Sequence, residues 1–164
     1  AKGILISFNG SEIDKTMSQE LSLEMLKTMD CLKIKKYNDA LYFGQVHPKT
    51  GHREGKGIMK YKNGRVYEGD FYKDLRHGNG FEQYPNGNTY LGGFYEGKAH
   101  SNGIYKWNNG EVYDGEWKHG LKNGNGMWKG TNGDSYIGEW IESKAEGYGV
   151  HVWSNGDRYE GEWK

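Results

Sequence analysis

The side chains that could carry out chemistry include six histidines and one cysteine, and their spacing matches no familiar reactive site. No two histidines are spaced as His-x-x-x-His on a helix, and none pairs with cysteines at the spacing of a zinc site. Cys31 has no patterned histidine partner that would activate it as a nucleophile. We therefore expect no metal site and no nucleophilic cysteine. The histidines are His47, His52, His77, His100, His119 and His151.

The carboxylates and glycines recur in patterns that favour structure over catalysis. Glu116, Glu139 and Glu162 lie at equivalent positions, where a solvated role is a better explanation than general acid–base catalysis. The Gly-x-Gly pairs lack the third glycine of a dinucleotide fingerprint, and they open neither a helix nor a P-loop. We expect these glycines to be flat strand positions, and we expect no catalytic residue, no cofactor and no enzymatic activity.

These residues recur because the chain is built from tandem repeats. The pattern Tyr-x-Gly-x-aromatic appears five times with a spacing of 23 residues, and a degenerate copy begins at Tyr42, which makes about six repeats. A period this constant predicts identical units that stack side by side. The five copies are Tyr67–Phe71, Tyr90–Phe94, Tyr113–Trp117, Tyr136–Trp140 and Tyr159–Trp163.

Each repeat continues with a second pattern, in which Gly-x-Gly precedes an aromatic residue and then Asn-Gly. Gly78, Gly80 and Tyr84 form one such set, while Ser101 and Gly130 replace the first glycine and the aromatic residue in two later copies. Asn-Gly is a strong signal for a hairpin turn because both residues accept positive φ. We therefore predict two antiparallel strands per repeat, joined by a loop of about five residues.

The alternation of side chains along a strand predicts two different faces. Tyr113, Gly115 and Trp117 share one face, whereas Asp114 and Glu116 point to the other. We expect an aromatic face with a glycine floor and an acidic, wet opposite face. The predicted fold class is mainly β, an elongated single-layer antiparallel strip of β-hairpins.

The composition agrees with a single layer. Only 34% of the residues are hydrophobic and 27 are glycine, while 13 Tyr, 6 Trp and 5 Phe supply much of the apolar surface. The formal net charge is zero, which gives no reason to expect a nucleic-acid partner. A single cysteine is typical of a reducing compartment, so we expect a cytoplasmic protein. We also expect the chain to be a fragment of a longer protein.

The phrases YEGDF, YDGEWKHG, YIGEW and YEGEW, with Gly-x-Gly and Asn-Gly at fixed offsets, resemble MORN repeats (membrane occupation and recognition nexus) over about residues 42–164. The resemblance implies an open strip of β-hairpins with an accessory or scaffolding role. MORN repeats occur in junctional membrane proteins, lipid kinases, a lysine methyltransferase, ciliary spokes and cytoskeletal scaffolds. The resemblance therefore implies a place at the cytoskeleton, a cilium or the cytosolic face of a membrane.

Residues 1–41 lie before the repeats and form a separate predicted region. Ile4–Phe8 is a short apolar run that predicts a strand. Thr16 begins a capping-box pattern, and a helix is predicted from there to about Lys36. Its apolar stripe could pack on or cap the repeats, or it could serve a different partner, because methionine adapts to varied surfaces. The stripe consists of Met17, Leu21, Met25, Met29 and Leu32.

Our main functional prediction is a non-catalytic scaffold that binds a partner helix or extended peptide through the aromatic, glycine-lined groove. Large aromatic side chains commonly act as the anchors of such interfaces. The predicted groove residues are Tyr67, Phe71, Tyr90, Phe94, Tyr113, Trp117, Tyr136 and Trp140.

Charge varies along the strip and supports other interpretations. Residues 42–79 carry a net charge of +4, and residues 130–164 carry −4. The two ends could be solvated surface, could contact each other head to tail between copies, or could hold an anionic phospholipid at the basic end. The chain could also be the accessory part of a larger lipid kinase or methyltransferase. The predicted lipid contacts are Lys56, Lys60, Lys62, Arg65 and Lys73.

Overall fold

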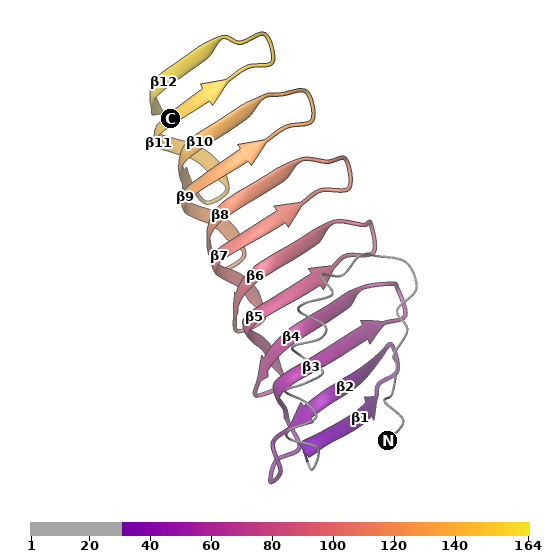
Figure 1. Ribbon diagram of the computed structural model, residues 1–164. Helices are drawn as coiled ribbons and strands as arrows, with labels where there is room; N and C mark the ends of the chain where they lie inside the picture. The colour runs from indigo at the N-terminus through magenta and orange to yellow at the C-terminus, as the bar shows by residue number, and fades with distance from the viewer. Residues whose placement is uncertain (1–30) are drawn as a thin grey trace, which may run out of the picture.

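The computed structural model describes residues 31–164, which form one antiparallel sheet of 12 strands in sequence order (Figure 1). Every strand pairs with its neighbours in the chain, so the sheet is a continuous meander that grows into an elongated strip. The predicted fold class is confirmed. The strands are β1 (Leu32–Lys36), β2 (Ala40–Val46), β3 (Arg53–Tyr61), β4 (Val66–Tyr72), β5 (Leu75–Gln83), β6 (Thr89–Tyr95), β7 (Lys98–Lys106), β8 (Val112–Lys118), β9 (Leu121–Lys129), β10 (Ser135–Ile141), β11 (Lys144–Val152) and β12 (Arg158–Trp163).

The Asn-Gly turns connect one repeat to the next. In the turn after β3, the Tyr61 amide donates to the Arg65 carbonyl at 2.9 Å, and Gly64 has a φ of 91°. The Asn63 side-chain oxygen accepts the Arg65 amide at 3.0 Å. Asparagine therefore contributes an acceptor and glycine contributes the left-handed backbone, which is how a three-residue hairpin loop is closed.

The turn within each repeat from β4 onward is shorter than predicted, while residues 47–52 connect β2 and β3 in the first repeat. Only Lys73 and Asp74 lie between β4 and β5, with φ values of 47° and 67°. Positive φ at both central residues is typical of the type I′ turn, whose twist matches that of the flanking strands. The prediction of a five-residue loop was wrong, although Gly97 and Gly120 mark the equivalent turns of two later repeats with φ values of 80° and 86°.

The first glycine of each Gly-x-Gly pair forms a bulge and is not a flat strand position. The register between β4 and β5 shifts between Gly69 and Phe71, and Gly78 in the bulge has a φ of 65°. Ser101 takes the same place in its repeat with a φ of 61°, a conformation that L-residues seldom adopt. The bulge lets the strand curve so that the next aromatic ring can fold inward.

The second glycine of each pair lies directly under a tyrosine ring. A Cβ atom on Gly80 would lie 2.5 Å from the Tyr67 hydroxyl oxygen. That hydroxyl donates to the Asp70 carbonyl at 2.7 Å, and the Tyr67 ring makes edge contacts with Phe71 and Phe94 at 5.0 and 5.2 Å between centroids. Each tyrosine thus joins its own repeat to the next. The core is a single row of interlocked rings rather than a layer between two sheets.

We predicted an acidic, wet opposite face, and this prediction was wrong for the middle of that face. Residues paired across successive strands form a line of mostly apolar side chains along the middle of this face. Glu68, Asp114 and Glu160 interrupt this line. Exposure varies widely along this line, because Ile58 and Glu68 are buried while Ile137 is 57% exposed. Burial raises the pKa of Glu68 above its ordinary value. The apolar members are Ile34, Phe43, Ile58, Phe81, Leu91, Ile104, Met127, Ile137 and Val150.

The prediction of a helix from Thr16 to Lys36 was wrong at its C-terminal end. Leu32–Lys36 is the strand β1, which pairs with β2 so that Ile34 lies opposite Phe43. Tertiary pairing therefore outweighs local helix propensity here. The rest of the predicted helix and the strand at 4–8 lie outside the described residues. Nowhere in residues 31–164 is there a helix long and apolar enough to cross a membrane.

Candidate functional site

The eight predicted groove residues form the buried row of the aromatic face. Their exposed fractions range from 0% for Tyr67 and Tyr113 to 9% for Trp117. The Trp117 and Trp140 indole nitrogens donate to the carbonyls of Gly103 and Gly126 at 3.0 and 3.1 Å. These rings hold neighbouring repeats together and offer little surface to a partner. Their role in partner binding stays a prediction.

A second row of aromatic residues lies beside the buried row on the same face. It comes from the aromatic position that follows Gly-x-Gly, together with the residue two places before it in the same strand. Five of these side chains are half-buried against the core, whereas Trp153 is exposed at 38%. Our site prediction omitted this row, although its spacing is visible in the sequence. Its members are Tyr61, Tyr84, Tyr105, Trp107, Trp128 and Trp153.

Two arginines hold a buried carboxylate at the edge of this row. Glu82 is fully buried and makes ion pairs with both Arg65 and Arg76. A second guanidinium nitrogen of Arg76 donates to the Gly97 carbonyl at 2.5 Å. Burial, then the nearby Glu82 carboxylate, raises the pKa of Tyr84 well above its ordinary value. The buried charge is therefore paired, and the tyrosine hydroxyl stays neutral.

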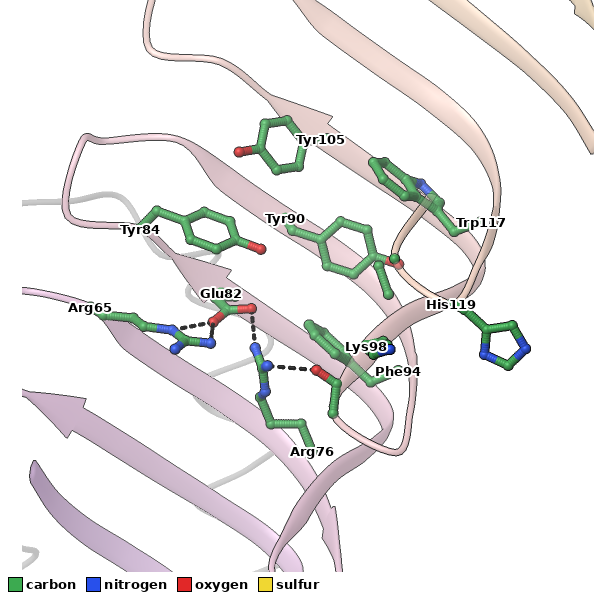
Figure 2. Close-up of a pocket in the computed structure, with 13 residues that line it drawn as sticks. Arg65, Arg76, Glu82, Tyr84, Tyr90, Phe94, Lys98, Tyr105, Trp117 and His119 are labelled. Carbon is green, nitrogen blue, oxygen red and sulfur yellow. Dashed lines mark hydrogen bonds and ion pairs between the residues drawn. The ribbon is translucent and has the colours of Figure 1, made fainter. Parts of the chain in front are cut away.

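A hollow of about 360 Å³ opens next to this cluster, in the middle of the strip. Figure 2 shows the rings of Tyr84, Tyr90, Tyr105 and Trp117 around it, with Glu82 and its two arginines at one side. Ala99 is also part of its lining. The hollow therefore combines aromatic walls with several charged side chains.

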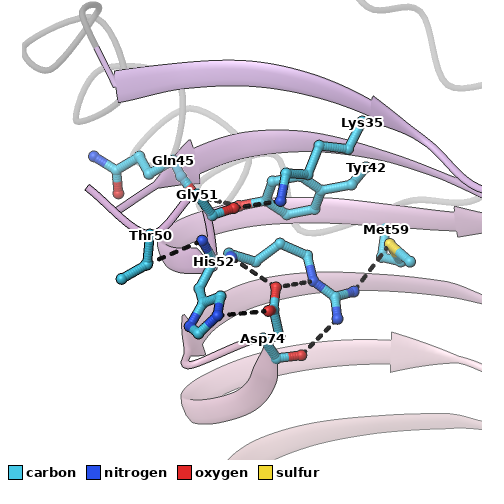
Figure 3. Close-up of polar contacts among 9 residues, drawn as sticks. Lys35, Tyr42, Gln45, Thr50, Gly51, His52, Met59 and Asp74 are labelled. Atoms are coloured by element: carbon cyan, nitrogen blue, oxygen red, sulfur yellow. Dashed lines mark hydrogen bonds and ion pairs between the residues drawn. The ribbon is translucent and has the colours of Figure 1, made fainter. Parts of the chain in front are cut away.

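A polar cluster at the first repeats has a structural role (Figure 3). The Arg53 amide and Nε both donate to Asp74 Oδ1, at 2.8 and 3.1 Å, and Arg53 Nη2 donates to the Asp74 carbonyl at 2.6 Å. Burial would raise the pKa of Asp74, but the hydrogen bonds from Arg53 outweigh it and hold that pKa below its ordinary value. Lys35 Nζ also donates to the Gly51 carbonyl. The Arg53 bonds join the start of β3 to the turn between β4 and β5, and the Lys35 bond holds the loop between β2 and β3.

The five predicted lipid contacts do not form one patch. Lys56 makes an ion pair with Asp70 at 2.7 Å, and Arg65 holds the buried Glu82 on the aromatic face. Lys62 and Lys73 are exposed, but they occupy turns at opposite ends of the strands. Lys60 is partly buried, which lowers its pKa. Phospholipid binding by this set stays a prediction.

The histidines of residues 31–164 are not grouped as metal ligands. In the part of the chain that the structure describes, no three His, Cys, Asp or Glu side chains are grouped closely enough to hold a metal ion. His77 and His100 lie among tyrosines at the loop end of the sheet, where each contacts the Tyr95 ring at 5.2 and 5.5 Å. Ring packing is thus the observed role of these two histidines.

These features define a class of protein: a single-layer β-repeat module with an open aromatic face. MORN repeats match residues 51–64, 67–89, 90–112, 113–135 and 136–158, and the chain belongs to the MORN repeat family. The five matches confirm the resemblance. The first of them, residues 51–64, covers the second half of the degenerate repeat, while Tyr42–Val46 and the last copy, Tyr159–Trp163, lie outside the matched residues.

Comparison with solved structures finds the TCP domain of SAS-4 from Drosophila melanogaster, in complex with a proline-rich motif of Ana2. It is 11% identical, with 79% of this chain and 89% of that chain covered and a TM-score of 0.33. A likeness this low carries no functional argument. None of the curated proteins compared with the chain matches it.

Proposed function

We propose that this chain is a non-catalytic protein-interaction scaffold that binds a partner helix or extended peptide along its aromatic face. The observation that carries the proposal is the open second row of aromatic side chains. Within residues 31–164 a single sheet is present, so no other described element packs over this row. MORN repeats are generally non-catalytic modules, and membership of the family supports the scaffold role.

The two aromatic rows would have different roles in binding. The buried row fixes the spacing of the repeats through edge-to-face contacts, while the half-buried rings of the second row present flat apolar surface at that spacing. Tyrosine and tryptophan are favoured as interface anchors because they bury a large area while losing little conformational freedom. A cytoplasmic scaffold at the cytoskeleton, a cilium or a membrane would use the strip in this way.

The test uses the full chain as bait, identification of a co-purified partner, and calorimetry with that partner in purified form. Trp107→Ala and Trp153→Ala should each weaken binding on the order of tenfold, because anchor rings commonly contribute 1–2 kcal/mol or more. Ile137→Ala is the control, since this side chain is exposed on the opposite face. Unchanged affinity in both tryptophan variants, with loss of affinity in Ile137→Ala, would place recognition on the other face and refute the proposal.

A further inference from the structure

Five equivalent positions on the aromatic face begin the second strand of successive repeats. They are occupied by Arg53, Arg76, Ala99, Lys122 and Ala145, with a spacing of 23 residues. The three cationic side chains all lie over aromatic rings of the core. Arg76 is 5.8 Å from the Tyr67 centroid and 5.3 Å from that of Phe94. Arg53 is 5.3 Å from the centroid of Phe71.

Lys122 shows the arrangement most fully. Its Nζ lies 4.4 Å from the Trp140 centroid, 5.4 Å from that of Tyr113 and 5.6 Å from that of Trp107. A cation within about 6 Å of a ring face is attracted by the negative potential of the π-electrons. Burial lowers the pKa of Lys122, while the carboxylate of Glu111 acts in the opposite direction. The repeat thus builds an aromatic cage that accepts a cation.

Ala99 has the same cage but no side chain to fill it. The rings that correspond to Trp107, Tyr113 and Trp140 are Tyr84, Tyr90 and Trp117, each 23 residues earlier. Tyr90 and Trp117 meet edge to face at 5.4 Å. Tyr105 adds a fourth ring, 5.8 Å from Tyr84 and 6.1 Å from Trp117 between centroids. The 360 Å³ hollow lies here and is lined by all four rings.

Ala145 provides an internal comparison. Its cage would need an aromatic ring at position 130, where the chain has glycine. Tyr136 and Trp163 remain, with centroids 5.5 Å apart, and the His151 ring lies 6.4 Å from Tyr136 and 5.8 Å from Trp163. Only the Ala99 repeat therefore combines a full set of rings with a small residue at the cation position.

We propose that the cage formed by Tyr84, Tyr90, Tyr105 and Trp117 binds a lysine or arginine side chain of the partner protein. The inference rests on the proposed function, because the partner must lie along this face. It names the anchor that the partner supplies: a cation in the position that Lys122 occupies one repeat further on.

The charged groups around the hollow set the strength of this contact. Glu82 carries a negative charge at one wall, but Arg65 and Arg76 are paired with it. Lys98 and His119 are exposed at the rim. Asn88 occupies the place where Glu111 assists Lys122. Three cationic side chains line the hollow against one carboxylate, so the rings must provide the attraction against a net positive charge and an isolated cation should bind weakly.

The test follows the indole N–H signals of the full chain by NMR during titration with n-butylammonium, and in a second arm with n-propylguanidinium. At constant ionic strength, the Trp117 signal should shift saturably, with a Kd on the order of tens of millimolar for one cage contact. The neutral isostere n-butanol should bind at least about threefold more weakly, because it lacks the charge that the rings attract. The Trp140 signal should barely move, since Lys122 already lies over that ring.

Two matched variants make the test specific. Ala99→Lys places the chain's own cation in the cage and should weaken n-butylammonium binding at least about tenfold. Ala145→Lys adds the same charge beside Gly130 and should leave binding at Trp117 unchanged. If Ala99→Lys does not fold, the comparison of n-butylammonium with n-butanol on the unmodified chain decides the question.

Three outcomes would overturn the cage: no saturable shift at Trp117, equal binding of the neutral isostere, or undiminished binding in folded Ala99→Lys. None of them depends on the partner. Loss of partner binding in Trp107→Ala without any ammonium binding would leave the scaffold function standing and remove only the cation anchor.

Discussion

The hydroxyl groups of the buried tyrosines should be a main source of stability, and Tyr113→Phe tests this directly. Tyr113 is fully buried, and its hydroxyl donates to the Glu116 carbonyl at 2.9 Å. Phenylalanine keeps the edge contacts with Trp117 and Trp140, at 5.2 and 5.3 Å between centroids, but leaves that carbonyl without its donor. The loss of one buried hydrogen bond should cost about 1–2 kcal/mol.

The matched control is Tyr159→Phe at the end of the strip. Its hydroxyl makes the equivalent bond to the Glu162 carbonyl at 3.0 Å, but Tyr159 is 43% exposed. Water can replace the lost donor there, so the same substitution should cost less than about 0.5 kcal/mol.

Urea denaturation, followed by tryptophan fluorescence and by circular dichroism, measures both variants against the parent chain. A stack of repeats need not unfold in one step, so the midpoint is compared only where the two signals coincide. In a thermal scan followed by circular dichroism, the Tyr113→Phe melting temperature should fall on the order of 4 °C at this chain length. If Tyr113→Phe and Tyr159→Phe cost the same, ring packing alone holds the row and the argument from the hydroxyl is refuted.

Three further predictions concern the core and the buried charges. Trp117→Ala and Trp140→Ala should each destabilise the fold by about 3–5 kcal/mol in the same denaturation assay, and a cost below 1 kcal/mol would mean that these rings do not join the repeats. Arg76→Ala should lower the free energy of unfolding by about 3 kcal/mol, because it removes one partner of the buried Glu82 and the hydrogen bond to the Gly97 carbonyl. The control is Lys98→Ala, which removes an exposed charge nearby and should leave stability nearly unchanged. Burial raises the pKa of Glu68 in the folded state, so the fold favours the protonated carboxyl group. The stability that this group contributes is fully present below its ordinary pKa of 4.5 and is lost as the pH rises through the folded-state pKa. Glu68→Gln should therefore be more stable than the parent chain at neutral pH and lose that advantage below 4.5, and urea midpoints that show the parent more stable at neutral pH would contradict the assignment.

The features predicted well from the sequence are those that depend on near neighbours in the chain. The 23-residue period and the Asn-Gly turns are visible because each hairpin is closed by bonds between close residues, such as Tyr61 and Arg65. The order of strands follows from the same fact, since consecutive hairpins can only pair in sequence. The two-residue turns were missed although Gly97 and Gly120 signal two of them; the turn at Lys73 and Asp74 has no glycine, yet both residues adopt positive φ.

The site was harder to predict because burial depends on contacts between repeats. The pattern Tyr-x-Gly-x-Trp was assigned to an open groove, whereas edge-to-face packing across repeats buries these rings, as at Tyr90 and Trp117. The aromatic position at Tyr84 was recognised as part of the repeat, but nothing local shows that it lies beside the rings of neighbouring strands. The cage at Ala99 emerges only when equivalent positions of five repeats are compared in space.

The sequence by itself determined the family, the repeat unit and the hairpin order, because each is encoded by residues within one repeat. Only the tertiary structure decided which aromatic row is core and which is surface, that Leu32–Lys36 pairs as a strand, and that Glu68 is buried on the face expected to be wet. The physical reason is the same in each case. A side chain's exposure is set by the strand stacked beside it, and that neighbour belongs to another part of the chain.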